Sequence, residues 1–348
     1  MRKKAVIIPL LILLLMAAIV FGCGIGAVYI SPSQVISILF NKLSIHLQVE
    51  FTTQQEAVLL AIRLPRVLLG LLVGAALAIS GAALQGLFQN PLTEPGLIGV
   101  SSGATLGAVA VVVMGQKWFA GVMVVLGIFT LPVASFITAL VVTILVYRLS
   151  QNGGKTIVST VLLAGIALNA MAAALTGMLI YYASDAQLRS ITFWTLGSLG
   201  GATWNTIWAV APFILTAVFI LVKMSKPLNA FALGESNAAY IGIRTERIKQ
   251  VIIVLTAMAV GASVAVSGII MFVGLIVPHI LRLISGPDNR SLLPSAALLG
   301  ASLLIIADIV ARTVFHPAEI PIGIVTSLIG APFFIYILLN QRKKQVVF

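Results

Sequence analysis

Long apolar runs, separated by charged or Gly/Pro-rich breaks, cover nearly the whole chain. A helix that crosses a bilayer needs about 20 predominantly apolar residues, whereas a transmembrane barrel shows short alternating strands. The runs here are continuous, so they predict helices. The breaks define ten candidate spans: 5–28, 64–88, 96–114, 119–147, 156–182, 204–223, 247–268, 271–286, 292–312 and 321–340. We therefore expect an all-α polytopic membrane protein with about ten transmembrane helices.

Composition supports this class and excludes most others. Hydrophobic residues make up 60% of the 348 positions and charged residues only 9%, whereas a soluble domain carries about 25% charged residues. On a soluble chain, the net charge of +12 would suggest binding to nucleic acid. Here the basic residues sit at the ends of the spans, which is typical of the positive-inside rule. The lipid bilayer is the expected environment, and no nucleic-acid partner is expected.

The distribution of basic residues also predicts the orientation. If both termini are cytoplasmic, cytoplasmic segments hold 15 of the 21 Lys and Arg residues, which leaves six outside. The inverse orientation is disfavoured. The apolar run that ends at Gly22-Cys23 resembles a lipoprotein signal, but it continues to Ile30. We therefore expect it to remain as the first helix.

Glycines spaced four residues apart occur within the spans, for example Gly70/Gly74 and Gly103/Gly107. This spacing lets helix backbones approach closely, and in a chain with ten helices it favours internal packing over contact between subunits. One uninterrupted series of spans predicts a single transmembrane domain over residues 1–348.

The chain shows no catalytic constellation. A single cysteine, Cys23, excludes a cysteine-based zinc site, and three histidines (His46, His279 and His316) lie far apart. Gly153-Gly154-Lys155-Thr156 resembles the end of a phosphate-binding loop, but Leu149 occupies the position where that motif needs a glycine. We expect no metal, no cofactor and no enzymatic activity, so any ATP hydrolysis must come from a partner.

Acidic residues inside spans usually mark proton-coupled transport, because a carboxylate in hydrocarbon is costly. The middles of these spans contain essentially none. Asp308 lies about one turn from a helix end, and Arg312 at i+4 on the same face predicts a local ion pair. A secondary transporter that needs no ATPase is therefore the weaker alternative, and so is a purely structural membrane scaffold.

Several motifs together resemble one known family, the FecCD permeases of iron-siderophore, haem and cobalamin ABC importers. The motifs are Arg63-Leu64-Pro65-Arg66, Gly81–Gln85, Asn90-Pro91-Leu92, Glu94–Gly99, Leu162–Leu168, Phe272–His279, Ala307–Arg312, Glu319–Gly323 and Gly330–Phe334. The resemblance implies a type II ABC importer permease fold in the bacterial inner membrane. It also implies a homodimer, or a pair of related chains, with the translocation path at the dimer axis. Two cytoplasmic ATP-binding subunits and an extracytoplasmic substrate-binding protein are the implied partners.

The same resemblance assigns roles to particular residues. Arginines that match Arg63, Arg66 and Arg312 dock the binding protein in the family. Ordinary interfacial anchoring to lipid phosphates is the alternative role for these three side chains. The cargo implied by family breadth is an iron chelate, either a siderophore or haem, with cobalamin as the alternative.

Two further sites lie at the cytoplasmic side. The loop at about 226–247 resembles a pair of short coupling helices that fit a groove on the ATPase. The residues assigned to this coupling are Leu233, Gly234, Glu235, Ser236, Ala239, Ile241 and Gly242. The residues that match the family's cytoplasmic gate are Asn90, Leu92, Val158 and Ser159. Val158 departs from the more polar residue usual there, and Ser159 or Thr160 could instead cap a helix.

Overall fold

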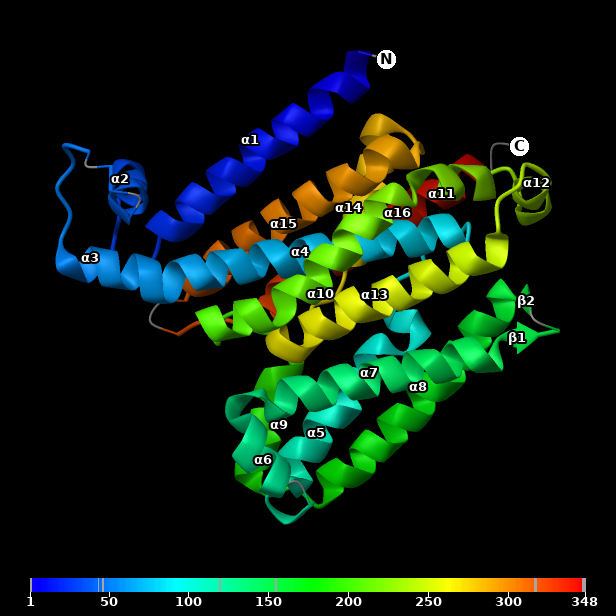
Figure 1. Ribbon diagram of the computed structural model, residues 1–348, viewed down its shortest axis with the longest axis horizontal. Coiled ribbons are helices and arrows are strands. Elements are labelled where there is room, and N and C mark those ends of the chain that lie inside the picture. The colour runs from blue at the N-terminus through cyan, green and yellow to red at the C-terminus, as the bar shows by residue number, and fades with distance from the viewer. Residues whose placement is uncertain are drawn as a thin grey trace.

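The computed structural model describes residues 2–42, 44–45, 47–118, 120–153, 155–315 and 318–345, and helices dominate it (Figure 1). The α-helices are α1 (Arg2–Gly24), α2 (Pro32–Lys42), α3 (Thr53–Val58), α4 (Leu64–Leu87), α5 (Val100–Trp118), α6 (Ala120–Leu126), α7 (Thr130–Leu149), α8 (Val158–Tyr181), α9 (Asp185–Thr195), α10 (Trp204–Lys223), α11 (Ser225–Phe231), α12 (Glu235–Tyr240), α13 (Thr245–Ser267), α14 (Val273–Ser285), α15 (Asn289–Thr313) and α16 (Ile322–Gln345). A π-helical turn, η1 (Leu59–Arg63), joins α3 to α4.

Three short elements connect the remaining helices. The 3₁₀ turn η2 (Pro95–Ile98) precedes α5, and η3 (Gly127–Phe129) joins α6 to α7. An antiparallel hairpin of β1 (Gln151–Asn152) and β2 (Lys155–Thr156) joins α7 to α8, with Gln151 opposite Thr156. The segment that resembled a phosphate-binding loop thus contributes to a hairpin, although Gly154 lies outside the described residues.

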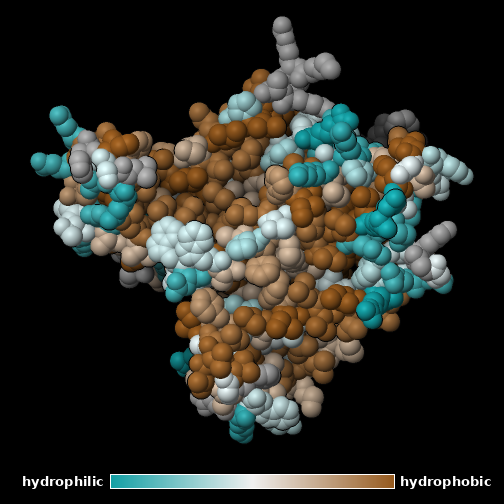
Figure 2. All heavy atoms as spheres, viewed as in Figure 1, coloured by the Kyte–Doolittle hydropathy of each residue, from teal (hydrophilic) through white to brown (hydrophobic). Residues whose placement is uncertain are grey.

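Each of the ten predicted spans contains a helix. Among the described residues, seven helical segments are long and apolar enough to cross a bilayer, and three apolar helices are shorter: Val100–Gly115, Val273–Ser285 and Ile322–Tyr336. This is compatible with the predicted count of ten. Figure 2 shows the apolar surface over the middle of the bundle and polar side chains gathered near its tips, as a bilayer requires.

The apolar pattern does not predict the short helices α2 and α9, which lie between the spans. A local signal marks α9: Ser184 accepts a hydrogen bond from the Gln187 N–H while the Gln187 side chain accepts one from the Ser184 N–H. Thr52 and Gln55 form the same capping box at α3. A serine or threonine followed by glutamine three residues later is therefore the sequence pattern that indicates the starts of α3 and α9.

Helix α4 forms the centre of the fold. It packs against α10, α13, α14 and α15. In the most apolar 18-residue stretch of the segment that contains α4, 89% of the residues are buried, whereas the corresponding figure for α8 is 22%. Glycines permit this closeness, because a Cβ on Gly74 would lie 2.3 Å from the Gly300 carbonyl oxygen. Gly103 and Gly107 on α5 face α7 in the same way, which confirms the predicted internal packing.

The bundle has two ends that matter for function. We call the end that carries α11, α12 and the β1–β2 hairpin the inner end, since the basic residues predict that it is cytoplasmic. The opposite end, where α3 meets α4 and α1 finishes, is the outer end (Figure 1).

Candidate functional site

Arg66, in the first turn of α4, lies between two carboxylates at the outer end. Its Nε donates to both carboxylate oxygens of Asp308 on α15, at 3.0 and 3.1 Å. Its two Nη atoms donate to the two carboxylate oxygens of Glu319, at 3.0 and 2.9 Å. Asp308 is buried, whereas the Glu319 side chain is 49% exposed. One side of the Arg66 guanidinium therefore contacts a buried carboxylate, and its other side contacts the half-exposed carboxylate of Glu319.

Arg63 and Arg312 close the C-terminal end of α1. Arg63 Nη1 donates to the carbonyl oxygens of Cys23 and Gly24, at 2.8 and 2.7 Å, and its Nη2 donates to the Val28 carbonyl. Arg312 Nη2 donates to the Gly22 carbonyl at 2.5 Å. The last carbonyls of a helix have no partner within the helix and carry partial negative charge. The two arginines thus provide hydrogen-bond donors for the carbonyl groups at the C-terminal end of α1.

The burial of the three arginines bears on one of the two earlier alternatives, anchoring to lipid. Arg63, Arg66 and Arg312 are only 4%, 9% and 8% exposed, so the hypothesis that they anchor the chain to lipid phosphates is wrong. Arg312 Nε lies 3.6 Å from Asp308 Oδ2, which confirms the predicted i,i+4 pair. Binding-protein docking stays a prediction, and Arg66 is the member whose partner is exposed.

At the inner end, the loop 226–247 forms two short helices separated by a break. Helix α11 ends at Phe231 and α12 begins at Glu235, with Gly234 between them at φ 98° and ψ 147°. The predicted helix–break–helix arrangement is confirmed. The seven residues assigned to coupling are all exposed: Leu233, Gly234, Glu235, Ser236, Ala239, Ile241 and Gly242. Leu233, Tyr240 and Ile241 leave apolar side chains uncovered, 65% to 88% exposed, which is typical of a partner surface.

The predicted gate residues lie at two helix ends. Asn90 Oδ1 accepts a hydrogen bond from the Leu92 N–H at 2.9 Å, which shapes the turn after α4. Val158 and Ser159 are the first residues of α8, and the N-cap residue is Ile157, with no capping side chain. The alternative that Ser159 or Thr160 caps this helix is therefore wrong. Helix α8 in turn contacts η2, where Asn169 Nδ2 donates to the Gly96 carbonyl at 3.1 Å.

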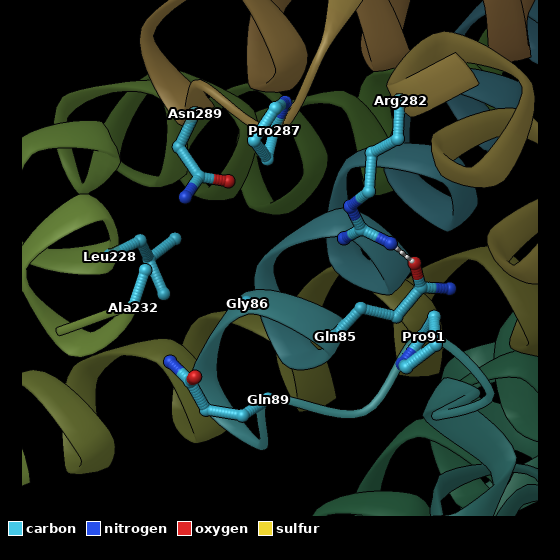
Figure 3. A pocket seen from close by; sticks show the side chains of 9 residues that line it. All are labelled: Gln85, Gly86, Gln89, Pro91, Leu228, Ala232, Arg282, Pro287 and Asn289. Atoms are coloured by element: carbon cyan, nitrogen blue, oxygen red, sulfur yellow. Dashed lines mark hydrogen bonds between the residues drawn. The ribbon is translucent and has the colours of Figure 1, made fainter. Parts of the chain in front are cut away.

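A cavity of about 260 Å³ opens at the inner end beside α11 (Figure 3). Arg282 on α14 donates to Gln85 Oε1 at 2.5 Å within it. The amide nitrogen of Gln85 donates to the carbonyls of Thr93 and Gly274, at 3.3 and 3.2 Å. Gln85 therefore joins α4, the turn after it and α14. Its place in a motif suggested no such role, because its partners lie up to 197 positions away.

Glu94 is an acidic residue inside the bundle that the span pattern does not reveal, because it falls between two spans. Its Oε1 accepts a hydrogen bond from the Phe272 N–H at 3.3 Å, immediately before α14. Phe272 has φ 68°, and the next residue but one, Gly274, packs against Gly81 in the interior of α4. A carboxylate at a helix N-terminus interacts favourably with the helix dipole, so Glu94 has a structural role here.

No group of three or more His, Cys, Asp or Glu side chains that could hold a metal occurs among the described residues. His279 lies with its ring edge against Phe333, at 6.4 Å between ring centroids. His46 and His316 lie outside the described residues.

Comparison with known proteins gives one consistent family. The profile of the FecCD transport family matches residues 12–340. The hemin transport system permease protein HmuU of Yersinia pestis is 44% identical over 82% of this chain and 84% of its own length. The vitamin B12 import system permease protein BtuC of Escherichia coli O9:H4 is 43% identical over 84% and 87%. A solved metal-chelate type ABC transporter in an inward-facing conformation covers 97% of this chain and 99% of its own, with a TM-score of 0.82 and 32% identity.

Proposed function

Because the chain belongs to the FecCD transport family, we propose that it is the membrane-spanning permease subunit of an ATP-driven importer of metal chelates. The observation that supports this most strongly is the match of the whole fold to a metal-chelate ABC transporter, over 97% of the chain. Iron chelates, siderophore or haem, are the first candidates for cargo. Cobalamin is the second, because the hemin and vitamin B12 relatives are almost equally similar, at 44% and 43% identity.

We further propose that residues 1–348 form one transmembrane domain that pairs with a second permease subunit, most simply another copy. The apolar side chains exposed along α8 support such a contact or a lipid contact: Leu163, Ile166, Met171, Leu175 and Met178. The dimer axis would provide the translocation path. Both termini are cytoplasmic in this proposal, in the inner membrane of a bacterium.

Two ATP-binding subunits dock at the inner end in this proposal. The exposed apolar side chains of Leu233, Tyr240 and Ile241 support this position, because burying them against a partner removes apolar surface from water. Asn90, Leu92, Val158 and Ser159 then line the cytoplasmic exit and open or close it.

The substrate-binding protein docks at the outer end through Arg66. Since Glu319 is half-exposed and holds the outer side of the Arg66 guanidinium, an acidic side chain of the binding protein would take its place. Arg63 and Arg312 contribute by fixing the end of α1 beside this cluster. Docking is therefore an exchange of one carboxylate for another.

The experiment that tests the function is transport in proteoliposomes. The chain is reconstituted with the ATPase and binding protein encoded beside it, and uptake of an iron-siderophore, haem and cobalamin is measured in parallel. We expect ATP-dependent uptake of one chelate and no ATP hydrolysis by the chain alone, because it lacks a phosphate-binding loop. Uptake that continues without the ATPase or without ATP would favour a secondary transporter instead.

Substitution of Gly234 tests the coupling loop. A Cβ at this position meets nothing closer than 3.9 Å, so Gly234→Ala introduces strain only through φ 98°. Gly234 has φ 98° and ψ 147°, a conformation that essentially only glycine adopts, so another residue held there costs about 1–3 kcal/mol, which should shift α12 relative to α11. We expect less chelate transported per ATP hydrolysed, with normal expression of the complex.

Gly121→Ala is the control, because Gly121 lies in α6, away from both proposed partner surfaces, with nothing within 4 Å of an added Cβ and no positive φ. Its transport and hydrolysis rates should equal those of the unaltered complex. If Gly234→Ala behaves like Gly121→Ala, the break between α11 and α12 has no part in coupling.

A further inference from the structure

Lys249, near the start of α13, is a buried cation with three acceptors on three different elements. Its side chain is 2% exposed. Its Nζ donates to the Thr156 carbonyl at 2.7 Å, to Glu235 Oε1 at 2.5 Å and to Glu246 Oε1 at 3.0 Å. A lysine ammonium has three donors, so all of them are used.

Glu246 completes the attachment of Thr156. Its second oxygen, Oε2, accepts a hydrogen bond from the Thr156 N–H at 2.9 Å. Both backbone groups of Thr156 are therefore held from α13. Because α8 begins at Val158, only Ile157 separates this fixed residue from the proposed gate.

Glu235 provides the other attachment, on the coupling loop. It is the first residue of α12, directly after the Gly234 break, and its side chain is 45% exposed. Removal of a buried cation from its carboxylate partners is unfavourable, because the charge is left without compensation. We therefore expect Lys249 to move together with α12 when α12 is displaced, because the ion pair between Lys249 and Glu235 is unfavourable to break.

We propose that Lys249 is a positioning residue that connects the coupling loop to the gate, through Glu235 on one side and Thr156 on the other. When an ATPase subunit displaces α12, the ion pair transmits the displacement to the start of α8, and Val158 and Ser159 move with it. The inference rests on the proposed function, since it needs an ATPase at α12 and a gate at α8.

Glu235→Ala and Lys249→Met test the connection in the reconstituted complex. Glu235→Ala cuts the link to α12 and leaves Lys249 paired with Glu246. We expect the amount of chelate transported per ATP hydrolysed to fall by about fivefold or more, within the range of coupling between linked sites. Lys249→Met should also lower the amount of chelate transported per ATP hydrolysed. If the Lys249→Met complex fails to assemble, Glu235→Ala still tests the connection.

The double variant separates transmission through Lys249 from direct contact between Glu235 and the ATPase. If the two residues act as one link, adding Glu235→Ala to Lys249→Met has no further effect. Full additivity of the two losses would overturn the inference. Lys42→Met is the control, because Lys42 forms an exposed ion pair with Glu56 at the outer end, at 3.3 Å, and should change nothing.

A distance measurement gives a readout that a loss of stability alone does not produce. Spin labels at Ile157, which is 42% exposed, report the separation of the two α8 starts across the permease pair. ATP should change this distance in the unaltered complex and leave it unchanged in Glu235→Ala. If Glu235→Ala keeps both the ATP-dependent change in distance and the normal transport per ATP, the proposed connection through Lys249 is wrong, while the proposed transport function still stands. Failure of the unaltered complex to import with ATP would instead overturn the proposed function.

Discussion

Replacement of Gly81 by alanine is expected to prevent the bundle from forming its native contacts. A Cβ at this position would lie 1.9 Å from the carbonyl oxygen of Gly274 and 2.7 Å from its Cα. These are backbone atoms, so no rotation of a side chain relieves the clash, and α14 must move away from α4. Overpacking a core typically costs about 1–3 kcal/mol and occasionally more. We expect a loss at the upper end of this range or beyond it, seen as a lower unfolding temperature in detergent and a broadened size-exclusion peak.

Gly177→Ala is the control for this loss. Gly177 lies in α8, and a Cβ there meets nothing within 4 Å. Alanine also has a higher helix propensity than glycine, so stability should stay the same or rise. A Gly81→Ala protein as stable as Gly177→Ala would show that α4 and α14 do not approach as closely as described.

Charge reversal at Arg66 is expected to remove docking and also to destabilise the chain. In Arg66→Glu the introduced carboxylate would face Asp308 and Glu319, so three carboxylates would converge where one cation now holds two. Removal of one partner from a buried ion pair costs about 3–5 kcal/mol. The substitution should therefore abolish binding of the substrate-binding protein and lower the unfolding temperature together, measured by pull-down and by thermal melting.

Glu319→Gln separates docking from stability. It leaves the buried pair of Arg66 with Asp308 intact and removes the charge that competes for the outer side of the guanidinium. We expect stability close to that of the unaltered chain and a higher affinity for the binding protein, with association that slows as salt rises. Weaker docking in Glu319→Gln would mean that Glu319 itself contacts the partner and that the exchange of carboxylates is wrong.

The long helices were predictable because each coincides with a continuous apolar run, and such a run is visible in the local sequence. The break at Gly234 was predictable for the same local reason, since glycine stands between two short helical segments. The short helices α2 and α9 were not, because they are too short for a span, and the signal that marks α9 is only the capping box of Ser184 and Gln187.

The hydrogen-bond partners of the arginines could not be predicted from the spacing of residues in the sequence. Arg63 and Arg66 stand three residues apart, yet one donates to the end of α1 and the other to α15 and Glu319. Arg66 and Asp308 are 242 positions apart. Helical spacing reports which side chains share a face, but it says nothing about what another helix places opposite them. For Lys249 likewise, only Glu246 is a neighbour in sequence.

The outer end of α1 has a consequence for how the chain is made. Its last carbonyls are satisfied by Arg63, some 40 positions later, and by Arg312, 290 positions later. Because a chain is synthesised from its N-terminus, α1 is made before either arginine, and its last carbonyls then lack these two donors. Its native end is completed only after α15 has been synthesised. The C-terminal end of α1 is thus completed long after the helix itself has been made, and only once α15 lies beside it.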